Sequence, residues 1–339
     1  MSSQFFGTDV LLFSNVGRAS AVLALVLGAS VAGAAVLPLP DSGDLIGEYT
    51  EVTAVHDDTL IDLARRFGLG YEEVVNANPG VDPWLPGAGT VVRLPLRRVL
   101  PDTPHEGIVV NLPEHRLYYY PAAKPGEARL VITYPISIGK MDWSTPIGLT
   151  RIATKIKDPA WYPPESVRSE HAKHGDILPK VVPAGPDNPL GQFAMRLAIP
   201  GGAYMIHGTN KPAGVGMQVT HGCMRLYPED IEELFKRVSV DTPVRIVNQP
   251  HKVGWDGGRL FVEVHPPLEA SDTGVFEPDR TALARLVANA VRGVSRHRQR
   301  DLGAGRDGVR GSAGDSGRGD RGGRGGRRRR VRLKGLSGA

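Results

Sequence analysis

The sequence predicts a mainly β protein, in which a β-rich domain at residues 105–248 follows a small βααβ module at residues 46–96. Short runs of alternating apolar and polar residues recur through the larger region, and such alternation is typical of half-buried strands. The chain of 339 residues also contains 28 Pro and 42 Gly, which supply the turns that many short strands require.

The N-terminal module (residues 46–96) combines strand and helix patterns. Asp57 or Asp58 is placed to cap a helix, because a short acidic side chain can accept from the unpaired N–H groups of a first turn. Gly68 follows that helix where a left-handed C-cap is expected. In order, we expect a strand at 49–52, this first helix over 60–67, a second helix at 71–76 and a closing strand at 90–95.

The larger domain reads as successive strands with one helix near its end. Apolar residues Ile231, Leu234 and Phe235 lie on one face of that helix. The expected elements are strands at 108–112, 116–120, 129–137, 148–155 and 203–207, a helix at 228–238 and a strand at 244–247. Residues 41–45 and 97–104 read as linkers, and residues 249–291 as an extension with a short strand and a helix.

The two ends of the chain differ from its body. Residues 292–339 carry 14 Arg and one Lys against four Asp, so the rest of the chain has a net charge of −6 although the whole chain has +5. This Arg/Gly-rich tail lacks core-forming residues and is predicted to be disordered. If the protein is exported, we expect this tail to bind no nucleic acid. It either binds anionic envelope surfaces or is solvated and has no specific partner.

The N-terminus has the pattern of an export signal. Arg18 precedes an uncharged apolar run at residues 19–39, and Ala32-Gly33-Ala34 fits the small-x-small rule for signal-peptide cleavage. The run is also long enough to cross a bilayer if it is kept. Residues 1–34 are therefore expected to be a signal peptide that is either removed or retained as an anchor.

Cys223 is the one cysteine of the chain, which excludes an intramolecular disulfide. His221 and His207 lie near it in sequence, and Cys with His can form a thiol nucleophile with its acid–base partner. Gly222 removes a side chain where backbone must approach a substrate. A buried structural cysteine and a His/His/Cys zinc site are the alternatives, although no fourth close ligand completes such a site.

The cysteine lies in a motif that resembles the active-site signature of the L,D-transpeptidases, the YkuD-type catalytic domain. That signature has a histidine, a gap of about a dozen residues, then Ser/Thr-His-Gly-Cys, an apolar residue and Arg or Asn. Here it is met by Ile-His-Gly-Thr-Asn at 206–210 and Thr-His-Gly-Cys-Met-Arg-Leu at 220–226. Further matches at 145–148, 183–191 and 227–231 extend the resemblance over residues 105–268.

The resemblance implies roles for individual residues and a mainly β fold. Cys223 would be a partly ionised thiol nucleophile whose pKa a nearby histidine lowers, His207 its base and later acid, and the Gly208 carbonyl the group that orients His207. Backbone N–H groups of His221, Gly222 and Cys223 would form the oxyanion site. The His221 side chain would either help to shape the oxyanion site or pack under the loop. Arg225 would either orient a carboxylate of the substrate or brace the cysteine loop, and Tyr204 and Thr220 are the other candidates for the substrate side. No cofactor and no metal are implied.

The resemblance also implies a substrate. Members act on tetrapeptide stems of peptidoglycan, breaking the bond between diaminopimelate and a terminal D-Ala through a thioester. The acceptor is a second diaminopimelate or a lysine of an envelope lipoprotein, and the relatives with this motif form are typically periplasmic. Two alternatives are a non-catalytic wall-binding protein and a thiol hydrolase that trims stems or detaches lipoprotein.

The N-terminal module resembles LysM, a sugar-binding domain for peptidoglycan and chitin. The resemblance rests on Asp-Thr-Leu at 58–60, Ala64, Asn76, Asn-Pro at 78–79 and the closing Val-Arg-Leu-Pro at 92–95. It departs from the usual pattern in a longer, proline-rich loop at 81–86 and in His56. The residues expected to bind glycan are Asp58, Thr59, Leu60, Asn78 and Pro79. A purely structural module is the alternative.

Overall fold

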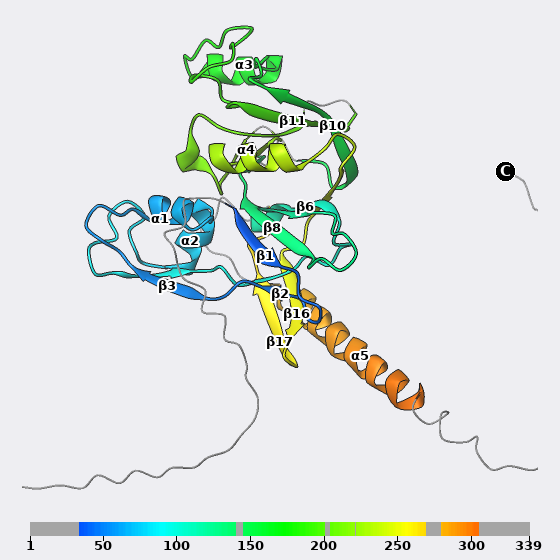
Figure 1. The fold of residues 1–339 in the computed structure, drawn as a ribbon. Helices are drawn as coiled ribbons and strands as arrows, with labels where there is room; N and C mark the ends of the chain where they lie inside the picture. Colours follow the sequence, from blue (N-terminus) through cyan, green and yellow to red (C-terminus); the bar gives the residue numbers. More distant parts are fainter. Residues whose placement is uncertain (1–33, 140–144, 201–203, 221, 269–278, 305–339) are drawn as a thin grey trace, which may run out of the picture. The chain divides into compact units, whose positions relative to one another are not determined.

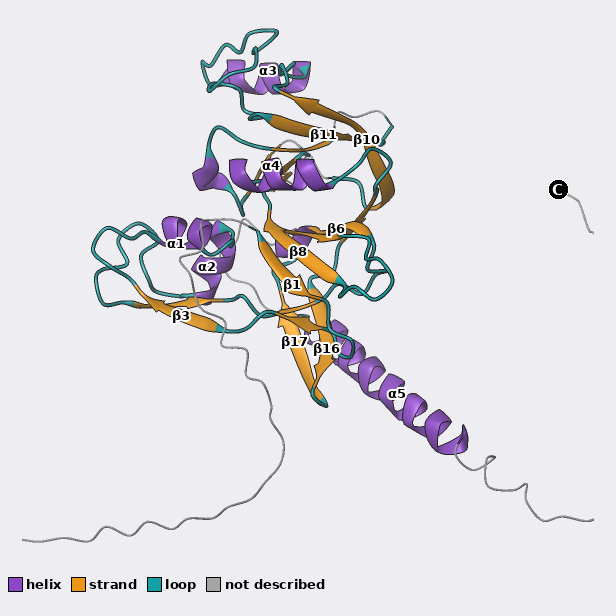
Figure 2. Ribbon diagram, in the orientation of Figure 1, coloured by secondary structure: helices purple, strands orange, loops and turns teal. Residues whose placement is uncertain are grey.

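The computed structural model describes residues 34–139, 145–200, 204–220, 222–268 and 279–304, with side chains as far as residue 292. Most of the predicted signal peptide, His221 and the Arg-rich residues 305–339 lie outside the described residues. The fold is mainly β, as predicted (Figures 1 and 2). Among the described helices, none is long and apolar enough to cross a membrane.

One nine-stranded sheet forms the larger domain. The 108–112 and 116–120 segments make the expected antiparallel hairpin, β6 and β7. Two strand pairs are parallel, β15 with β6 and β12 with β14, and the other pairs are antiparallel. The sheet order is β1 (Ala35–Pro38), β8 (Leu130–Pro135), β7 (Arg116–Tyr120), β6 (Gly107–Asn111), β15 (Pro243–Val247), β10 (Gly148–Lys157), β11 (Phe193–Leu197), β12 (Met205–His207) and β14 (Met224–Arg225).

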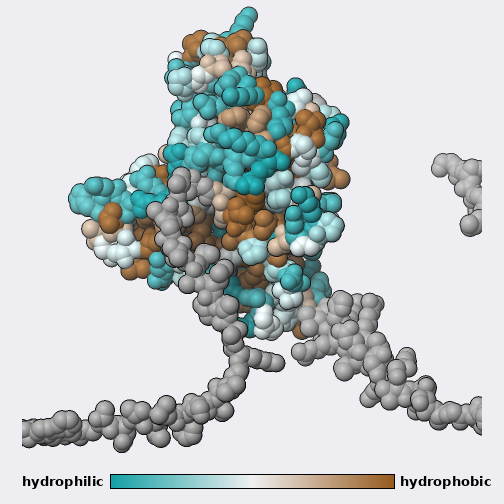
Figure 3. All heavy atoms as spheres, viewed as in Figure 1, coloured by the Kyte–Doolittle hydropathy of each residue, from teal (hydrophilic) through white to brown (hydrophobic). Residues whose placement is uncertain are grey.

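Helix α4 (Pro228–Arg237) contributes its apolar face to the core of this domain, as its spacing predicts. Ile231 and Leu234 are buried, and Phe235 packs on Phe193 of β11 with ring centroids 4.9 Å apart. Pro228 begins the helix at a position where its missing N–H costs nothing. Hydrophilic side chains lie over the outer side of α4 (Figure 3). The helix therefore closes the core directly after the segment that carries Cys223.

The N-terminal module has the predicted βααβ order. Strands β3 (Thr50–Thr53) and β4 (Val91–Leu94) pair antiparallel and flank α1 (Leu60–Arg66) and α2 (Tyr71–Ala77). The expected cap of α1 is wrong by one residue: Thr59, not Asp57 or Asp58, accepts from the Asp62 N–H at 3.0 Å. Thr59 has the extended backbone that a cap requires. Gly68 adopts φ 63°, the left-handed conformation expected after the helix.

Both predicted linkers are parts of the fold. Strand β2 (Leu45–Ile46) pairs with β5 (Arg98–Val99), so the linker assignments at 41–45 and 97–104 are wrong. Arg98 is buried because its guanidinium pairs with Glu73 at 2.6 Å. Of the two adjacent arginines, Arg97 is partly exposed and pairs with Asp256, whereas Arg98 is an internal counter-ion.

Several elements were not expected from the sequence. They are β9 (Ile138–Gly139) and its partner β13 (Gln218–Thr220), helix α3 (Glu165–Lys173), β11, and β16 (His251–Asp256). Strand β16 forms a hairpin with β17 (Arg259–Val264), which is the short strand expected in the 249–291 extension. Helix α5 (Arg280–Ala304) is longer than the expected 281–291. The predicted boundary of the tail at residue 292 therefore lies inside α5, whose residues 292–304 are rich in helix-forming Arg and Gln.

Candidate active site

Parallel pairing of β12 and β14 brings the two halves of the motif together. Ile206 lies opposite Met224 and His207 opposite Arg225, and the Leu226 N–H donates to the His207 carbonyl at 2.9 Å. In this register Cys223 precedes β14 at the level of Met205, whose backbone forms a hydrogen bond with the thiol. Residues far apart in the sequence are thus placed on neighbouring backbones.

His207 is held by the carbonyl that the sequence predicts. Its side chain is buried, and Nδ1 lies 2.7 Å from the Gly208 carbonyl oxygen. A carbonyl can only accept, so Nδ1 carries the proton and Nε2 is the basic nitrogen. Burial, with the charge of Arg225 next, lowers the pKa of His207 to about 3. The imidazole is therefore neutral in the resting site.

A tight turn at residues 188–191 packs against His207 and Gly208. The buried Asn188 side chain donates to the Pro159 carbonyl at 2.8 Å and accepts from the Leu190 N–H at 2.8 Å. A Cβ at Gly208 would lie 3.0 Å from Ile231 and 3.3 Å from the Leu190 carbonyl. The 183–191 match in the sequence thus marks a support for the histidine, a role that the sequence did not assign.

The backbone around Cys223 is fixed by two threonine hydroxyls. Thr220 Oγ1 donates to the Cys223 carbonyl at 2.6 Å, and the buried Thr145 Oγ1 donates to the Gly222 carbonyl at 3.0 Å. Gly222 has φ 90°, which a residue with a Cβ adopts only under strain. Thr220 therefore helps to shape the loop, and its expected place on the substrate side stays a prediction. Thr145 is a further loop residue, which the sequence matched without a role.

The Cys223 thiol is not activated in the resting site. Burial raises its pKa, and the Met205 backbone and the charge of Arg225 only partly oppose this effect. The expectation that a nearby histidine lowers the pKa is therefore wrong for the ligand-free protein. Its physical reason is that a neutral, buried imidazole supplies no positive charge to stabilise a thiolate.

Arg225 acts electrostatically on both His207 and Cys223 and has unused hydrogen-bonding capacity. Its backbone pairs with Ser137 in both directions, at 2.8 and 3.1 Å. Its Nε is buried and has no hydrogen-bond partner among the described residues. A buried guanidinium donor without an acceptor is costly, so Arg225 suits a ligand that brings an acceptor.

The other predicted site residues differ from one another in burial and in contacts. Tyr204 is half-buried against the sheet core just before β12. His221 lies outside the described residues. In the module, Leu60 is buried and the Asn78 side chain bonds to the Val74 and Arg93 carbonyls, so both serve packing.

The remaining residues of the predicted glycan site also have structural roles. Asp58 accepts from the Val55 N–H at 2.9 Å and pairs with Arg66 at 2.8 Å. Thr59 caps α1. Of the five predicted residues, Pro79 is exposed and not engaged in such a role.

One cluster of possible metal ligands occurs in the described part of the chain, and it lies apart from Cys223 and His207. Glu114, Glu263 and His265 converge there, but Lys252 Nζ already lies 2.7 Å from Glu114 and 3.0 Å from Glu263. The ammonium ion occupies the position that a cation would take. The cluster is therefore a buried ion-pair network that ties the β16–β17 hairpin to the sheet.

A buried histidine that is held by a backbone carbonyl, with a lone cysteine directly before the adjoining strand, is the arrangement of a cysteine–histidine enzyme. The model of the YkuD family, the L,D-transpeptidase catalytic domain, matches residues 105–246. The probable L,D-transpeptidase YcfS of Escherichia coli is 44% identical over 236 residues, 68% of this chain and 72% of that protein.

Two further relatives agree. The probable L,D-transpeptidase YbiS of Escherichia coli is 42% identical over 258 residues, 75% of this chain and 82% of that protein. The probable L,D-transpeptidase ErfK/SrfK of Salmonella typhimurium is 43% identical over 249 residues, 72% of this chain and 78% of that protein. This chain belongs to the L,D-transpeptidase family.

Proposed function

We propose that the enzyme transfers an acyl group from a peptidoglycan tetrapeptide stem through a thioester on Cys223. The observation that carries this proposal is the 2.7 Å contact between His207 Nδ1 and the Gly208 carbonyl, which leaves Nε2 as a base. As the sulfur attacks the diaminopimelate carbonyl carbon, the thiol proton passes to His207 Nε2. His207 then returns this proton to the departing D-Ala amine.

The second half of the reaction reverses these proton movements. An acceptor amine attacks the thioester carbonyl and gives a proton to His207, the new amide bond forms, and the Cys223 thiol is restored with that proton. The developing oxyanion would be met by backbone N–H groups of the 221–223 segment. Each such donor is worth about 3 kcal/mol to the transition state. The hydroxyls of Thr145 and Thr220 support this segment by fixing its carbonyls.

Arg225 is proposed to hold an acceptor group of the stem, such as a carboxylate. Its buried Nε, which has no partner among the described residues, supports this role, and its guanidinium is charged close to both His207 and Cys223.

The group that receives the acyl chain from the thioester is proposed to be a second diaminopimelate, a lipoprotein lysine or water. Mass spectrometry of sacculus peptidoglycan incubated with wild type or Cys223→Ala decides among them. The proposal expects D-Ala release only with wild type: new cross-links identify diaminopimelate as the acceptor, a lipoprotein peptide joined to the stem identifies lysine, and trimmed stems identify water. Equal products from both proteins would overturn the proposal.

For the N-terminal module we propose glycan binding of the LysM type. The Leu60 N–H donates to the Pro83 carbonyl at 2.9 Å, so the proline-rich loop lies against the start of α1. Asp82 fixes this loop by accepting from the Trp84 N–H at 2.8 Å, and the Trp84 side chain is 60% exposed. In the full chain, Trp84→Ala is expected to weaken co-sedimentation with sacculi while soluble-stem turnover persists. Unchanged sedimentation would favour a structural module.

Periplasmic location after export is also a proposal. Strand β1 begins at Ala35, directly after the predicted cleavage site, and pairs with β8 from its first residue, Ala35 with Thr133. A segment that completes this sheet edge cannot at the same time lie in a bilayer. N-terminal sequencing of the envelope protein should begin at or near Ala35; full-length protein in the cytosol alone would contradict export.

A further inference from the structure

We infer that the N-terminal module positions the cysteine segment (residues 217–226), in addition to any wall ligand that it binds. The inference rests on the proposed role of Cys223 as nucleophile. It is carried by contacts that the module makes to both flanks of this segment, on its N-terminal side at Val215 and Gly216 and on its C-terminal side at Tyr227 and Glu229.

The N-terminal flank is held by the start of α2. The Tyr71 N–H donates to the Val215 carbonyl at 3.0 Å, and the Glu72 N–H to the Gly216 carbonyl at 3.4 Å. These N–H groups belong to a first helical turn, which has no partners within its own helix. His115 Nδ1 reaches the same Gly216 carbonyl at 3.0 Å. The Val215 and Gly216 carbonyls of the flank thus accept hydrogen bonds from the free N–H groups at the N-terminus of α2.

Two glycines allow this approach. A Cβ at Gly216 would lie 2.4 Å from the Gly70 Cα, and a Cβ at Gly70 would lie 2.7 Å from the Gly216 Cα. Side chains at either position would push the backbones apart, because such distances are far inside van der Waals contact. At these two glycines the module therefore contacts the N-terminal flank through backbone alone, at a separation that only glycine permits.

The C-terminal flank is held by the end of α1 and the turn after it. Arg65 forms a bidentate pair with Glu229, with both N–O distances 2.8 Å, and its guanidinium lies 5.5 Å from the Tyr227 ring centroid. The buried Tyr227 hydroxyl donates to the Leu69 carbonyl at 3.2 Å. Bidentate pairing fixes direction as well as distance.

The module is itself fastened to the catalytic sheet. Glu73 of α2 accepts from Arg116 of β7 at 2.5 Å and from Arg98 at 2.6 Å, and all three side chains are shielded from solvent. The sheet therefore supports the module, and the module supports both ends of the cysteine segment. Because a misplacement of about 1 Å can cost about 100-fold in rate, this second support is relevant to chemistry.

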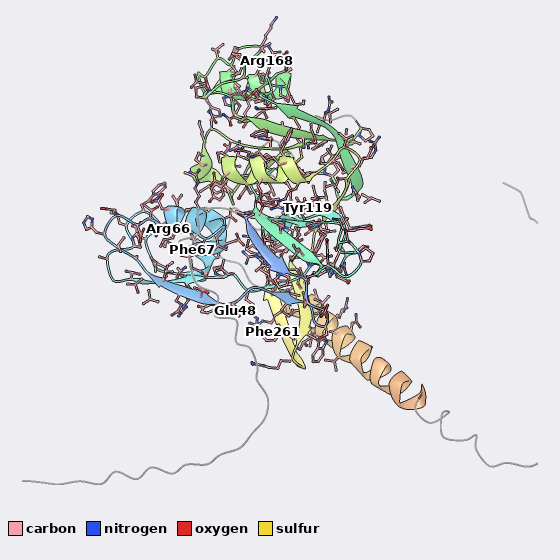
Figure 4. All side chains as sticks on the ribbon, in the orientation of Figure 1. Glu48, Arg66, Phe67, Tyr119, Arg168 and Phe261 are labelled. Carbon is pink, nitrogen blue, oxygen red and sulfur yellow. The ribbon has the colours of Figure 1, made fainter. Side chains whose placement is uncertain are left out.

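Two substitutions test the contacts, each with a neighbouring control. Gly70→Ala adds a clash with Gly216 at an ordinary φ of −89°, whereas Gly214→Ala adds a Cβ with nothing within 4 Å. Arg65→Ala breaks the pair to Glu229, whereas Arg66→Ala breaks a pair to Asp58 inside the module. Arg66 is the next residue of the same helix (Figure 4).

The measurement is the rate of Cys223 acylation by a carbapenem in the full chain, followed by intact mass, with the melting temperature of each variant recorded. We expect Gly70→Ala and Arg65→Ala to be at least about tenfold slower than wild type. The two controls should stay within about twofold, since surface changes shift energies by about 0.5 kcal/mol. The charge-reversed pair Arg65→Glu with Glu229→Arg should recover most of the rate.

The outcomes separate this inference from the proposed function. A wild type that is acylated, with interface variants as fast as their controls, would overturn the inference alone, even if melting temperatures fell. Loss of stability without loss of rate would mean a merely structural contact. A wild type that gains no adduct at Cys223 would overturn the proposed nucleophile and the inference with it.

Discussion

At the scale of single residues, burial sets the protonation state of the site. It raises the pKa of the Cys223 thiol and lowers that of His207 to about 3, so thiol and imidazole are both neutral before substrate binds. The proton must then move during attack rather than before it. His207 acts as a general base in this scheme, and not as the cation that stabilises a standing thiolate.

This protonation scheme predicts that kcat/KM falls only at an unusually low pH. With a His207 pKa of about 3, its neutral form persists well below the ordinary histidine value of about 6.5. We therefore expect kcat/KM for a soluble stem to be flat between pH 7 and pH 5. A loss of activity with a midpoint near 6.5, in enzyme whose circular dichroism is unchanged, would contradict a buried neutral base.

Removal of His207 tests its role directly. His207→Ala should slow thioester formation by about 100- to 10,000-fold, the range for positioned acid–base groups. His56→Ala is the matched control, because that histidine is exposed and belongs to the N-terminal module. Stopped-flow or intact-mass acylation kinetics give the comparison. Equal rates for the two variants would assign the base to another group.

The sequence predicted part of this site and missed the rest for a physical reason. His207, Gly208 and Cys223 stand in a dense motif, and the resemblance of that motif to the family signature implies their roles. Thr145 and Asn188 lie 78 and 35 residues before Cys223, and their hydrogen bonds to the loop and turn depend on how distant strands meet. Burial also decides the two pKa values, and burial is a property of the fold.

At the scale of elements, α4 carries an unsatisfied acid. Burial, with the neighbouring Glu229 adding to it, raises the pKa of Asp230 to about 8, and its Oδ2 has no hydrogen-bond partner among the described residues. The folded protein then holds a proton that the unfolded chain releases above pH 3.8. Stability should therefore fall as pH rises from about 4 to about 8.

Replacing Asp230 with a neutral residue should remove this loss of stability at high pH. Asp230→Asn should raise the melting temperature at pH 8 and have little effect at pH 4, because a shift of one pKa unit equals about 1.4 kcal/mol. Glu232→Gln on the same helix is the control, since Glu232 makes a half-exposed pair with Lys236 at 2.7 Å. Calorimetry at both pH values measures the effect. A destabilised Asp230→Asn at pH 8 would show that the carboxylate is ionised in the fold.

Several of the elements that the sequence missed are strands that can be recognised only from the strands with which they pair. Strand β1 reads as the end of an apolar export segment, because Ala-Val-Leu-Pro fits either environment, and only pairing with β8 makes it a strand. Strands β2 and β5 have two residues each, too short for any period to show. Helix α4 and the β6–β7 hairpin have strong local patterns and were predicted.

At the scale of the whole molecule, the Arg-rich end is proposed to bind anionic envelope surfaces without taking part in chemistry. Truncation after Ala304 keeps all of α5 and removes ten of the 14 tail arginines. Soluble-stem turnover should be unchanged, while retention on anionic envelope vesicles should fall. Retention of the full chain should also weaken steeply with salt, because exposed charges are screened beyond about 10 Å at 0.1 M. Salt-independent retention would contradict the proposal.

The central claim is that Cys223 is the nucleophile, and one intact-mass measurement tests it most directly. Wild type incubated with a carbapenem, which mimics the acyl donor of this family, should gain a single adduct. Cys223→Ala should gain none while keeping its circular dichroism spectrum and its binding to sacculi. An adduct on Cys223→Ala, or D-Ala release from stems at the wild-type rate without Cys223, would contradict the account.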